Sequence, residues 1–272
     1  MTDPQGPAGD GRTVWVTGAA SGMGASHARR FASRGDRVGC WDVDTEALKA
    51  VVGEIQTGGG AAVPAIADVT DWQAVQAAAA GVREALGPAS VVIANAGVLP
   101  SGEHVRELDP EAWRRVIDVN LTGAFLTAKA AIPQLRETGG GSLILISSVC
   151  GLTASAGYAA YNASKHGVIG LMRTLAHELG DAGVTVNAVC PGWVRTPMLD
   201  QSLEAGRDAG SSPEDYARMG LIERLVEPEE VTDAVEWLAS PGARMVTAVA
   251  LPLDGGLMEQ RAWPPEEAEF GA

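Results

Sequence analysis

A tyrosine and a lysine four residues apart carry the strongest chemical signal in the sequence. Tyr161 and Lys165 lie in YNASK, within a stretch typical of a helix, so both side chains project from one helix face. A phenol titrates near pH 10, and an adjacent ammonium favours its ionised form by about two to three pKa units. Tyr161 could therefore act as a general base toward an alcohol or a general acid toward a ketone. Such pairs are more common on solvated helix surfaces, so further residues must support this hypothesis.

A glycine-rich loop near the N-terminus adds a second chemical signal. The sequence TGAASGMG, with Gly18, Gly22 and Gly24, directly follows the first expected strand. Glycine permits positive φ and lets backbone N–H groups approach a pyrophosphate at a helix N-terminus. The pattern predicts a dinucleotide site, although a tight turn between a strand and a helix would use the same residues.

Asp42 tests the dinucleotide hypothesis and predicts which cofactor binds. It lies 24 residues after Gly18 at the end of the second expected strand. A carboxylate there accepts hydrogen bonds from ribose hydroxyls and repels a 2′-phosphate. No Arg or Lys lies in the glycine loop or directly beside Asp42. We therefore expect NAD rather than NADP, with an exposed aspartate capping the next helix as the alternative.

The elements that position these residues alternate between short β-branched runs and longer helical stretches. Strands separated by helices of ten or more residues pair in parallel through right-handed crossovers. The pattern predicts an α/β fold with an open, doubly wound Rossmann-type sheet of about seven strands and helices on both faces. The expected strands are 13–17, 37–42, 61–67, 91–94, 143–147, 184–189 and 246–251. The expected helices follow the glycine loop to about residue 34 and cover 45–56, 71–86, 109–136, 157–179 and 227–239.

Composition limits the protein's organisation and partners. The chain has 272 residues and a formal net charge of −14, which disfavours nucleic acid and anionic membranes as partners. It contains no apolar run of about 20 residues and no signal-peptide pattern, so we expect a cytoplasmic protein. Three cysteines without a close pair and four dispersed histidines predict no disulfide framework and no metal site. We expect one domain over 12–257, a flexible leader over 1–11, and a tail over 258–272 that is disordered or contacts another subunit.

Taken together, the motifs resemble the short-chain dehydrogenase/reductase family over residues 12–257. TGAASGMG resembles the family's cofactor loop, NAG at 95–97 resembles its segment after the fourth strand, and DVNLTG resembles the segment with its helix asparagine, Asn120. Ser148 precedes Tyr161 by 13 residues, which is the family's separation, so Ser148 rather than Ser147 is the expected catalytic serine. The resemblance implies hydride transfer between a secondary alcohol carbon and a nicotinamide.

The resemblance also assigns roles to four expected catalytic residues. Tyr161 exchanges the hydroxyl proton, and Ser148 holds the substrate oxygen. Lys165 lowers the tyrosine pKa and binds the nicotinamide ribose, while Asn120 supports a proton relay. Because all four positions are filled, an enzyme is favoured over a non-catalytic NAD-binding module, which stays an alternative.

The resemblance further implies cofactor contacts spread along the chain. Asp68 would hydrogen-bond the adenine beside Val69, and Val194 and Thr196 would contact the nicotinamide carboxamide. The complete expected set is Gly18, Ser21, Gly22, Met23, Gly24, Asp42, Val43, Asp68, Val69, Asn95, Ala96, Gly97, Tyr161, Lys165, Pro191, Gly192, Val194 and Thr196.

The expected substrate pocket is mostly apolar, which suits a hydrophobic or medium-sized secondary alcohol or ketone. Its expected residues are Leu99, Cys150, Tyr158, Trp193 and Met198, with Leu152, Leu199 and Leu203 as further candidates that could equally belong to the core. Arg195 could pair with a substrate carboxylate or phosphate, although a solvent-facing role is favoured.

Two alternative classes of enzyme share some of these motifs, and the resemblance also predicts an assembly state. The stretch 191–256 also resembles 3-hydroxybutyrate dehydrogenases and NADPH-dependent ketoreductases of β-keto acyl or polyketide-like substrates. The polyketide enzymes place a basic residue after the second strand, where this chain has Asp42. Sugar epimerases and dehydratases share the Tyr–Lys pair but need a longer C-terminal part. By resemblance we expect a homotetramer built on the helices 109–136 and 157–179.

Overall fold

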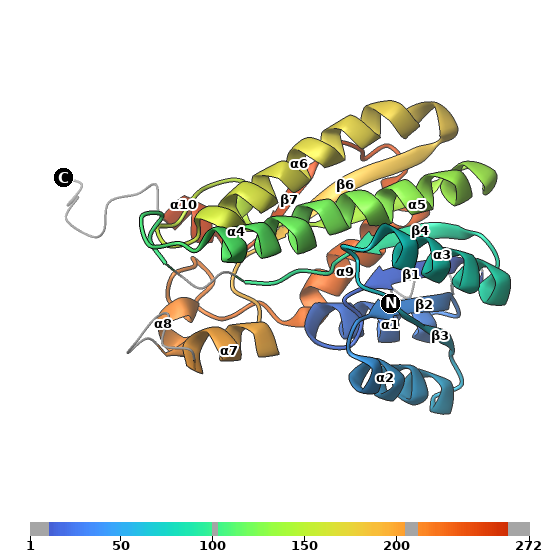
Figure 1. Cartoon of the computed structure of the whole chain (residues 1–272), viewed down its shortest axis with the longest axis horizontal. Helices are drawn as coiled ribbons and strands as arrows, with labels where there is room; N and C mark the ends of the chain where they lie inside the picture. The colour runs from blue at the N-terminus through green and yellow to red at the C-terminus, as the bar shows by residue number, and fades with distance from the viewer. Residues whose placement is uncertain (1–10, 100–102, 205–211, 261–272) are drawn as a thin grey trace, which may run out of the picture.

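The computed structural model describes residues 11–99, 103–204 and 212–260, and its centre is a seven-stranded sheet (Figure 1). All strand pairs are parallel, and the strand order is β3-β2-β1-β4-β5-β6-β7. The strands are β1 (Thr13–Thr17), β2 (Arg37–Asp42), β3 (Ala61–Ile66), β4 (Ala89–Ala94), β5 (Gly141–Ile146), β6 (Val184–Pro191) and β7 (Ala250–Leu253).

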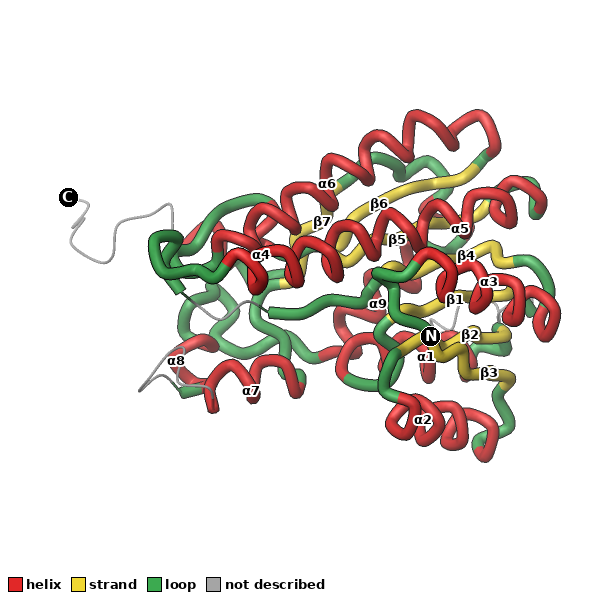
Figure 2. Tube along the Cα trace, in the orientation of Figure 1, coloured by secondary structure: helices red, strands yellow, loops and turns green. Residues whose placement is uncertain are grey.

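Helices cover both faces of this sheet (Figure 2). One core packs α3, α5 and α6 against it, and the other packs α1, α2 and α9 against the opposite face. The helices are α1 (Gly22–Ser33), α2 (Thr45–Thr57), α3 (Trp72–Leu86), α4 (Pro110–Ile117), α5 (Gly123–Glu137), α6 (Ala159–Leu179), α7 (Pro197–Glu204), α8 (Pro213–Ala217), α9 (Pro228–Leu238) and α10 (Leu257–Gln260). This arrangement is the predicted doubly wound Rossmann-type fold.

Local sequence explains why the elements begin where they do. Every residue of β1, TVWVT, is buried, as expected for a central parallel strand covered on both faces. Asp71 caps α3 by accepting from the backbone N–H groups of Gln73 and Ala74. Asp109 caps α4 in the same way, with Pro110 at the first helical position.

The site lies where the winding of the sheet reverses. β1 is hydrogen-bonded to both β2 and β4, so the chain proceeds toward one edge through β3 and toward the other through β7. At such a switch point the connections diverge and leave a crevice beyond the carboxyl ends of the strands. The glycine loop and the segment after β4 both begin at this edge.

The structure differs from the predicted elements at several positions. The expected helix over 109–136 is interrupted by a π-helical turn, η1 (Asp118–Thr122). The last strand begins at Ala250 rather than at 246, because Ala248 adopts a positive φ of 61° that breaks the extended backbone. Helices α7 and α8 were not expected, and α10 crosses the expected boundary at residue 257. Residues 1–10 of the expected leader and 261–272 of the expected tail lie outside the described residues.

Candidate active site

Two adjoining cavities open at the carboxyl edge of the sheet. The larger, of about 740 Å³, extends along the glycine loop and the ends of β2 and β3. The smaller, of about 100 Å³, lies beside the segment after β5 and the N-terminus of α6. Met23, Thr196 and Met198 line both, so the two cavities meet at these side chains. We call them the cofactor cleft and the substrate cavity.

The glycine loop is shaped by its backbone. Gly18 and Gly22 have positive φ values of 68° and 51°, which side-chain-bearing residues rarely adopt. A Cβ on Gly24 would collide with the carbonyl oxygen of Gly18. Asn95 anchors the loop, because its Nδ2 donates to the carbonyl oxygen of Thr17 at 2.9 Å. Only glycine therefore leaves a backbone cradle at this position, which suits a bulky anionic group approaching the N-terminus of α1.

Asp42 braces the same loop from the end of β2. One carboxylate oxygen accepts the backbone N–H of Ala20 at 3.0 Å, and the other accepts that of Asp44 at 3.0 Å. The side chain also lines the cofactor cleft next to Val43, which is exposed. Asp42 thus positions the loop as well as facing the cleft, a role that sequence spacing does not reveal.

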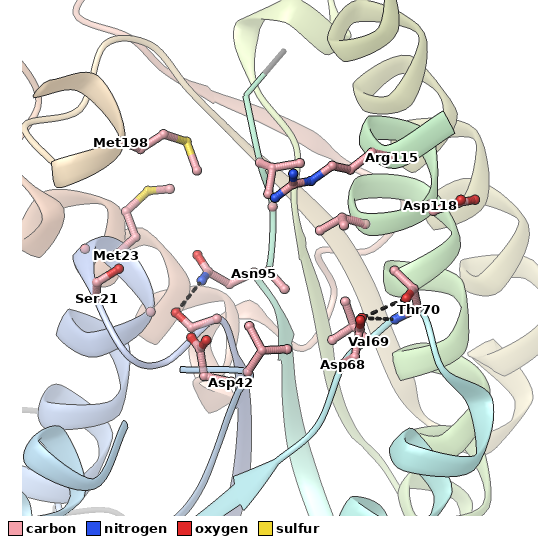
Figure 3. Close-up of a pocket in the computed structure, with 18 of the residues that line it drawn as sticks. Ser21, Met23, Asp42, Asp68, Val69, Thr70, Asn95, Arg115, Asp118 and Met198 are labelled. Carbon is pink, nitrogen blue, oxygen red and sulfur yellow. Dashed lines mark hydrogen bonds between the residues drawn. The ribbon is translucent and has the colours of Figure 1, made fainter. Parts of the chain in front are cut away.

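The structure gathers most of the expected cofactor residues around the cleft (Figure 3). Asp68 accepts from the backbone N–H and the hydroxyl of Thr70, each at 2.8 Å. The expected residues that line the cofactor cleft are Gly18, Ser21, Gly22, Met23, Gly24, Asp42, Val43, Asp68, Val69, Asn95, Ala96, Gly97 and Thr196. Pro191, Gly192, Val194 and Tyr161 line the substrate cavity instead, and Lys165 lines neither.

The α4 wall of the cleft carries charged residues that the sequence analysis missed. Arg114 and Arg115 both line the cleft, together with Glu111 and Asp118. Arg114 is ion-paired with Glu111, whereas Arg115 has no ion pair within the described part of the chain. Figure 3 shows the Arg115 side chain extending from α4 toward the centre of the cleft. The signal was present in the i, i+4 spacing of 111, 115 and 119, which puts these residues on one helix face.

Ser148 and Tyr161 meet in the substrate cavity. Ser148 caps the short helix η2 (Val149–Gly151), where its hydroxyl accepts the backbone N–H of Cys150 at 3.1 Å. Tyr161 lies in the first turn of α6, and its phenol is hydrogen-bonded to the Ser148 side chain. The helix position and the preceding loop therefore bring together two hydroxyls that are 13 residues apart in the sequence.

Burial controls the titration of both members of the Tyr–Lys pair. Burial raises the pKa of Tyr161 above its ordinary value, and the hydrogen bond to Ser148 opposes this only in part. Burial also lowers the pKa of Lys165 to about 8. The Lys165 Nζ lies 5.5 Å from the centre of the Tyr161 ring and donates to the carbonyl oxygen of Ile146 at 2.9 Å. Desolvation is therefore the largest influence on the tyrosine pKa, and the expected lowering of this pKa by Lys165 stays a prediction.

Asn120 occupies the π-helical turn η1 and is almost fully buried. Its Oδ1 accepts the backbone N–H of Val98 at 2.8 Å, and its Nδ2 donates to the Val98 carbonyl oxygen at 3.0 Å. A Cβ on Gly97 would lie 3.4 Å from Asn120 Oδ1 and 3.6 Å from Lys165 Nζ. The two side chains thus converge on the backbone at Gly97. Single π turns within α-helices are frequent at functional sites.

All five expected substrate residues line the substrate cavity: Leu99, Cys150, Tyr158, Trp193 and Met198. Leu199 lines it too, and Ser155 and Val149 are lining residues that the sequence analysis missed. Leu152 instead packs against the main core, and the Leu203 side chain lies outside the described residues. Arg195 is exposed and pairs with Glu227 at 3.1 Å, so it faces solvent rather than the cavity.

Two kinds of feature are absent from the described residues. No group of three or more His, Cys, Asp or Glu side chains there could hold a metal ion. None of the helices in this part of the chain has the length and apolar character needed to cross a membrane.

Comparison with known proteins agrees with this fold. A family model described as Enoyl-(Acyl carrier protein) reductase matches residues 18–258. The chain belongs to the short-chain dehydrogenase/reductase family. It is an oxidoreductase of the type that acts on CH–OH groups, and this family binds a nicotinamide dinucleotide.

Three relatives show the range of activities around this chain. Cis-4-hydroxycyclohexanecarboxylate dehydrogenase of Sinomonas cyclohexanicum is 38% identical over 245 residues, covering 90% of this chain and 96% of that protein. Cyclohexanol dehydrogenase of Acinetobacter sp. (strain SE19) is 34% identical over 244 residues, covering 90% and 94%. The crystal structure of a single-substitution variant of actinorhodin polyketide ketoreductase with NADPH has a TM-score of 0.87 and 38% identity, covering 91% of this chain and 97% of that one.

Proposed function

We propose that the protein is an NAD-dependent dehydrogenase that interconverts a cyclic secondary alcohol and its ketone, with Tyr161 as the acid/base. The observation that carries this proposal is the junction of the two cavities. The Tyr161 and Ser148 hydroxyls line the substrate cavity, and this cavity meets the cofactor cleft at Met23, Thr196 and Met198. The names of two relatives, a cyclohexanol dehydrogenase and a hydroxycyclohexanecarboxylate dehydrogenase, support a cyclic alcohol.

The cofactor cleft suits a nicotinamide dinucleotide. Its volume of about 740 Å³ lies within the range of small-molecule and cofactor sites. The glycine loop leaves space for a pyrophosphate where any Cβ on Gly24 would intrude. The glycine loop would hold the dinucleotide, which would supply a nicotinamide able to accept the carbinol hydrogen with its electron pair or to return it. The protein supplies position, charge and the route for the proton.

Four side chains divide the remaining work. In alcohol oxidation the Tyr161 phenolate takes the hydroxyl proton as the carbonyl forms, and in ketone reduction the phenol returns it. Ser148 donates a hydrogen bond to the substrate oxygen. Asn120 and Lys165 act behind this pair, where Asn120 holds the Val98 backbone and the Lys165 ammonium donates to Ile146. Because burial raises the pKa of Tyr161, we expect a positive charge next to the phenol to favour the phenolate during turnover.

A Tyr161→Phe variant tests this proposal directly. We expect NADH to bind as tightly as in the parent protein, measured by the change in cofactor fluorescence. Turnover of secondary alcohols should fall by at least a hundredfold, because general acid–base catalysis contributes factors of about 10² to 10⁴. Activity within tenfold of the parent would show that another group moves the proton. Loss of turnover with NADH binding retained also argues against a module that only binds NAD.

Asp42 supports NAD as the preferred cofactor. Its carboxylate faces the cleft at the end of β2, where it would repel a 2′-phosphate and accept ribose hydroxyls. The second candidate, an NADPH-dependent ketoreductase, is favoured by the structural likeness to a ketoreductase solved with NADPH and by the two arginines in the cleft. Steady-state kcat/KM with each cofactor distinguishes them, and a higher value with NADP would reverse the assignment.

Assembly as a homotetramer and a cytoplasmic location stay predictions. Exposed aromatic residues on the expected interface helices support the tetramer, since Trp113 on α4 is 38% exposed and Phe125 on α5 is 43% exposed. Light scattering of the purified protein tests assembly, and fractionation of cells that produce it tests location. A monomer in light scattering would contradict the tetramer.

A further inference from the structure

The substrate cavity has an uncharged lining. Within the described part of the chain, no Asp, Glu, Lys, Arg or His side chain lines it. Its polar side-chain groups are hydroxyls, the Cys150 thiol and the Trp193 indole, and the remainder of its wall is aliphatic or aromatic. Such a wall can hydrogen-bond a neutral oxygen but offers no counter-charge to an ion.

Two cations close in sequence to the cavity residues are engaged elsewhere. Lys165 is buried, lines neither cavity, and has its ammonium hydrogen-bonded to the Ile146 carbonyl oxygen at 2.9 Å. Arg195 is exposed and paired with Glu227. Among the described lining residues, a substrate carboxylate would therefore find no cation to offset the hydration it loses.

A negative charge on the substrate would also oppose proton removal by Tyr161. Burial already raises the pKa of Tyr161, and a second anion beside the phenol would raise that pKa further. Each additional pKa unit removes about nine-tenths of the phenolate at a given pH. A carboxylate would consequently weaken both binding and proton removal.

The shape of the cavity favours a compact ring. Its volume of about 100 Å³ is of the same order as the ~150 Å³ apolar cavities that hold benzene. Trp193 forms one wall, and its ring is braced by Tyr216 of α8, with ring centroids 4.3 Å apart. Met198 and Leu199 complete this apolar side. A flat aromatic wall backed by a second ring provides a rigid surface for an alicyclic face.

We propose, as a refinement that rests on the proposed function, that the substrate is an uncharged alicyclic secondary alcohol or ketone, selected by the neutral cavity between Ser148, Trp193 and Leu199. The cavity disfavours alicyclic alcohols that carry an ionised carboxylate. In the reaction the carbinol C–H bond breaks with its electron pair passing to the oxidised nicotinamide. The O–H proton passes to Tyr161, and the C=O bond forms.

The test compares three ring alcohols that differ in charge. Cyclohexanol, 4-hydroxycyclohexanecarboxamide and 4-hydroxycyclohexanecarboxylate are each assayed with NAD at pH 8, where the acid is ionised and the amide of nearly the same shape is not. We expect kcat/KM for the carboxamide to exceed that for the carboxylate by at least tenfold, and by about a hundredfold if about 2.8 kcal/mol of desolvation is uncompensated. A ratio below ten would overturn the proposal.

A charge placed in the wall provides a second readout. Met198→Lys should raise the ratio of carboxylate to carboxamide kcat/KM by at least tenfold, whereas Met198→Gln, of similar length and uncharged, should not. Because the measure is a ratio, general damage to the enzyme cancels. An equal ratio in the two variants would contradict the proposal. If open-chain secondary alcohols are oxidised and ring alcohols are not, the ring preference is wrong while the proposed function stands. If no secondary alcohol is oxidised although NADH binds, the proposed function itself fails.

Discussion

The cofactor cleft and the substrate cavity share one edge of the sheet, but different parts of the chain shape them. Backbone geometry forms the cleft: positive φ at Gly18, the tight approach at Gly24 and the hydrogen bond from Ala20 to Asp42. The loop also continues into a large core, since Ala19 belongs to the cluster that packs α1 against the sheet.

One side of the substrate cavity is supported by a smaller hydrophobic cluster. Leu199, Tyr216 and Leu225 form a separate cluster, with Trp193 packed against it. This cluster joins α7 and α8, which lie apart from the sheet (Figure 1). Side chains can therefore change at the substrate end without disturbing the fold, whereas the cofactor end tolerates little change. We infer that the backbone constrains which cofactor binds. Side chains that can be replaced determine which substrate binds.

The largest expected effect is at the glycine loop. Gly24→Ala should weaken NADH binding by more than a hundredfold or prevent folding, because the new Cβ collides with the Gly18 carbonyl oxygen. Fluorescence titration measures binding, and circular dichroism separates misfolding from loss of affinity. The matched control is Gly53→Ala on α2, where a Cβ meets nothing within 4 Å. If Gly24→Ala bound NADH normally, the cleft would not depend on the backbone as inferred.

An intermediate effect is expected from Arg115, which has no ion pair among the residues that the structure describes. Arg115→Gln should weaken NADH and NADPH about equally, by about tenfold, if the guanidinium contacts the pyrophosphate that both share. Arg114→Gln is the control, since Arg114 is already paired with Glu111. The readout is the dissociation constant of each cofactor at low and high salt. An effect confined to NADPH would assign Arg115 to the 2′-phosphate instead.

A smaller effect should distinguish the substrate cavity from the cofactor cleft. Tyr216→Ala removes the ring that braces Trp193, and we expect KM for cyclohexanol to rise about fivefold, which corresponds to the ~1 kcal/mol of an aromatic pair. The dissociation constant of NADH should not change. Trp237→Ala, at an exposed aromatic residue of α9, controls for loss of an aromatic side chain. A parallel loss of NADH affinity would show that the two ends are not independent.

The smallest effect near neutral pH concerns a histidine behind the glycine loop. His27 of α1 is fully buried, and burial lowers its pKa to about 3. Between pH 6.5 and 3 the unfolded chain binds more protons than the folded protein, so the free energy of unfolding falls as the pH falls, by about 1 kcal/mol per pH unit. Urea unfolding over this pH range measures the slope.

Two histidine variants check this origin of acid sensitivity. His27→Gln should reduce the slope, while His177→Gln, at an exposed position of α6, should leave it unchanged. Equal slopes in the parent and His27→Gln would assign the acid sensitivity to other groups. The difference in slope would also measure how much of the acid sensitivity comes from the buried, neutral ring of His27.

Local signals explain what the sequence predicted well. Buried β-branched runs, the glycine loop and the capping residues Asp71 and Asp109 all act within a few residues, so their pattern predicts strands, turns and helix starts. The fold and the gathering of the expected cofactor residues at the switch point follow from these signals. Features that depend on distant contacts were not predicted. The π turn at 118–122, the paired rings of Trp193 and Tyr216, and the desolvation of Tyr161 depend on neighbours far apart in the sequence.

The side chains of Met23 and Met198 lie between the two cavities. Thioether side chains have several rotatable bonds and adapt to what lies against them, and each of these two borders both compartments. A ligand bound in one cavity then changes which rotamers these methionines can adopt toward the other cavity. The binding free energies of the two ligands are thereby linked. Such linkage is reciprocal, so the affinity measured for an alcohol should depend on whether the dinucleotide is oxidised, reduced or missing, and the affinity for the dinucleotide should shift with the alcohol by the same factor.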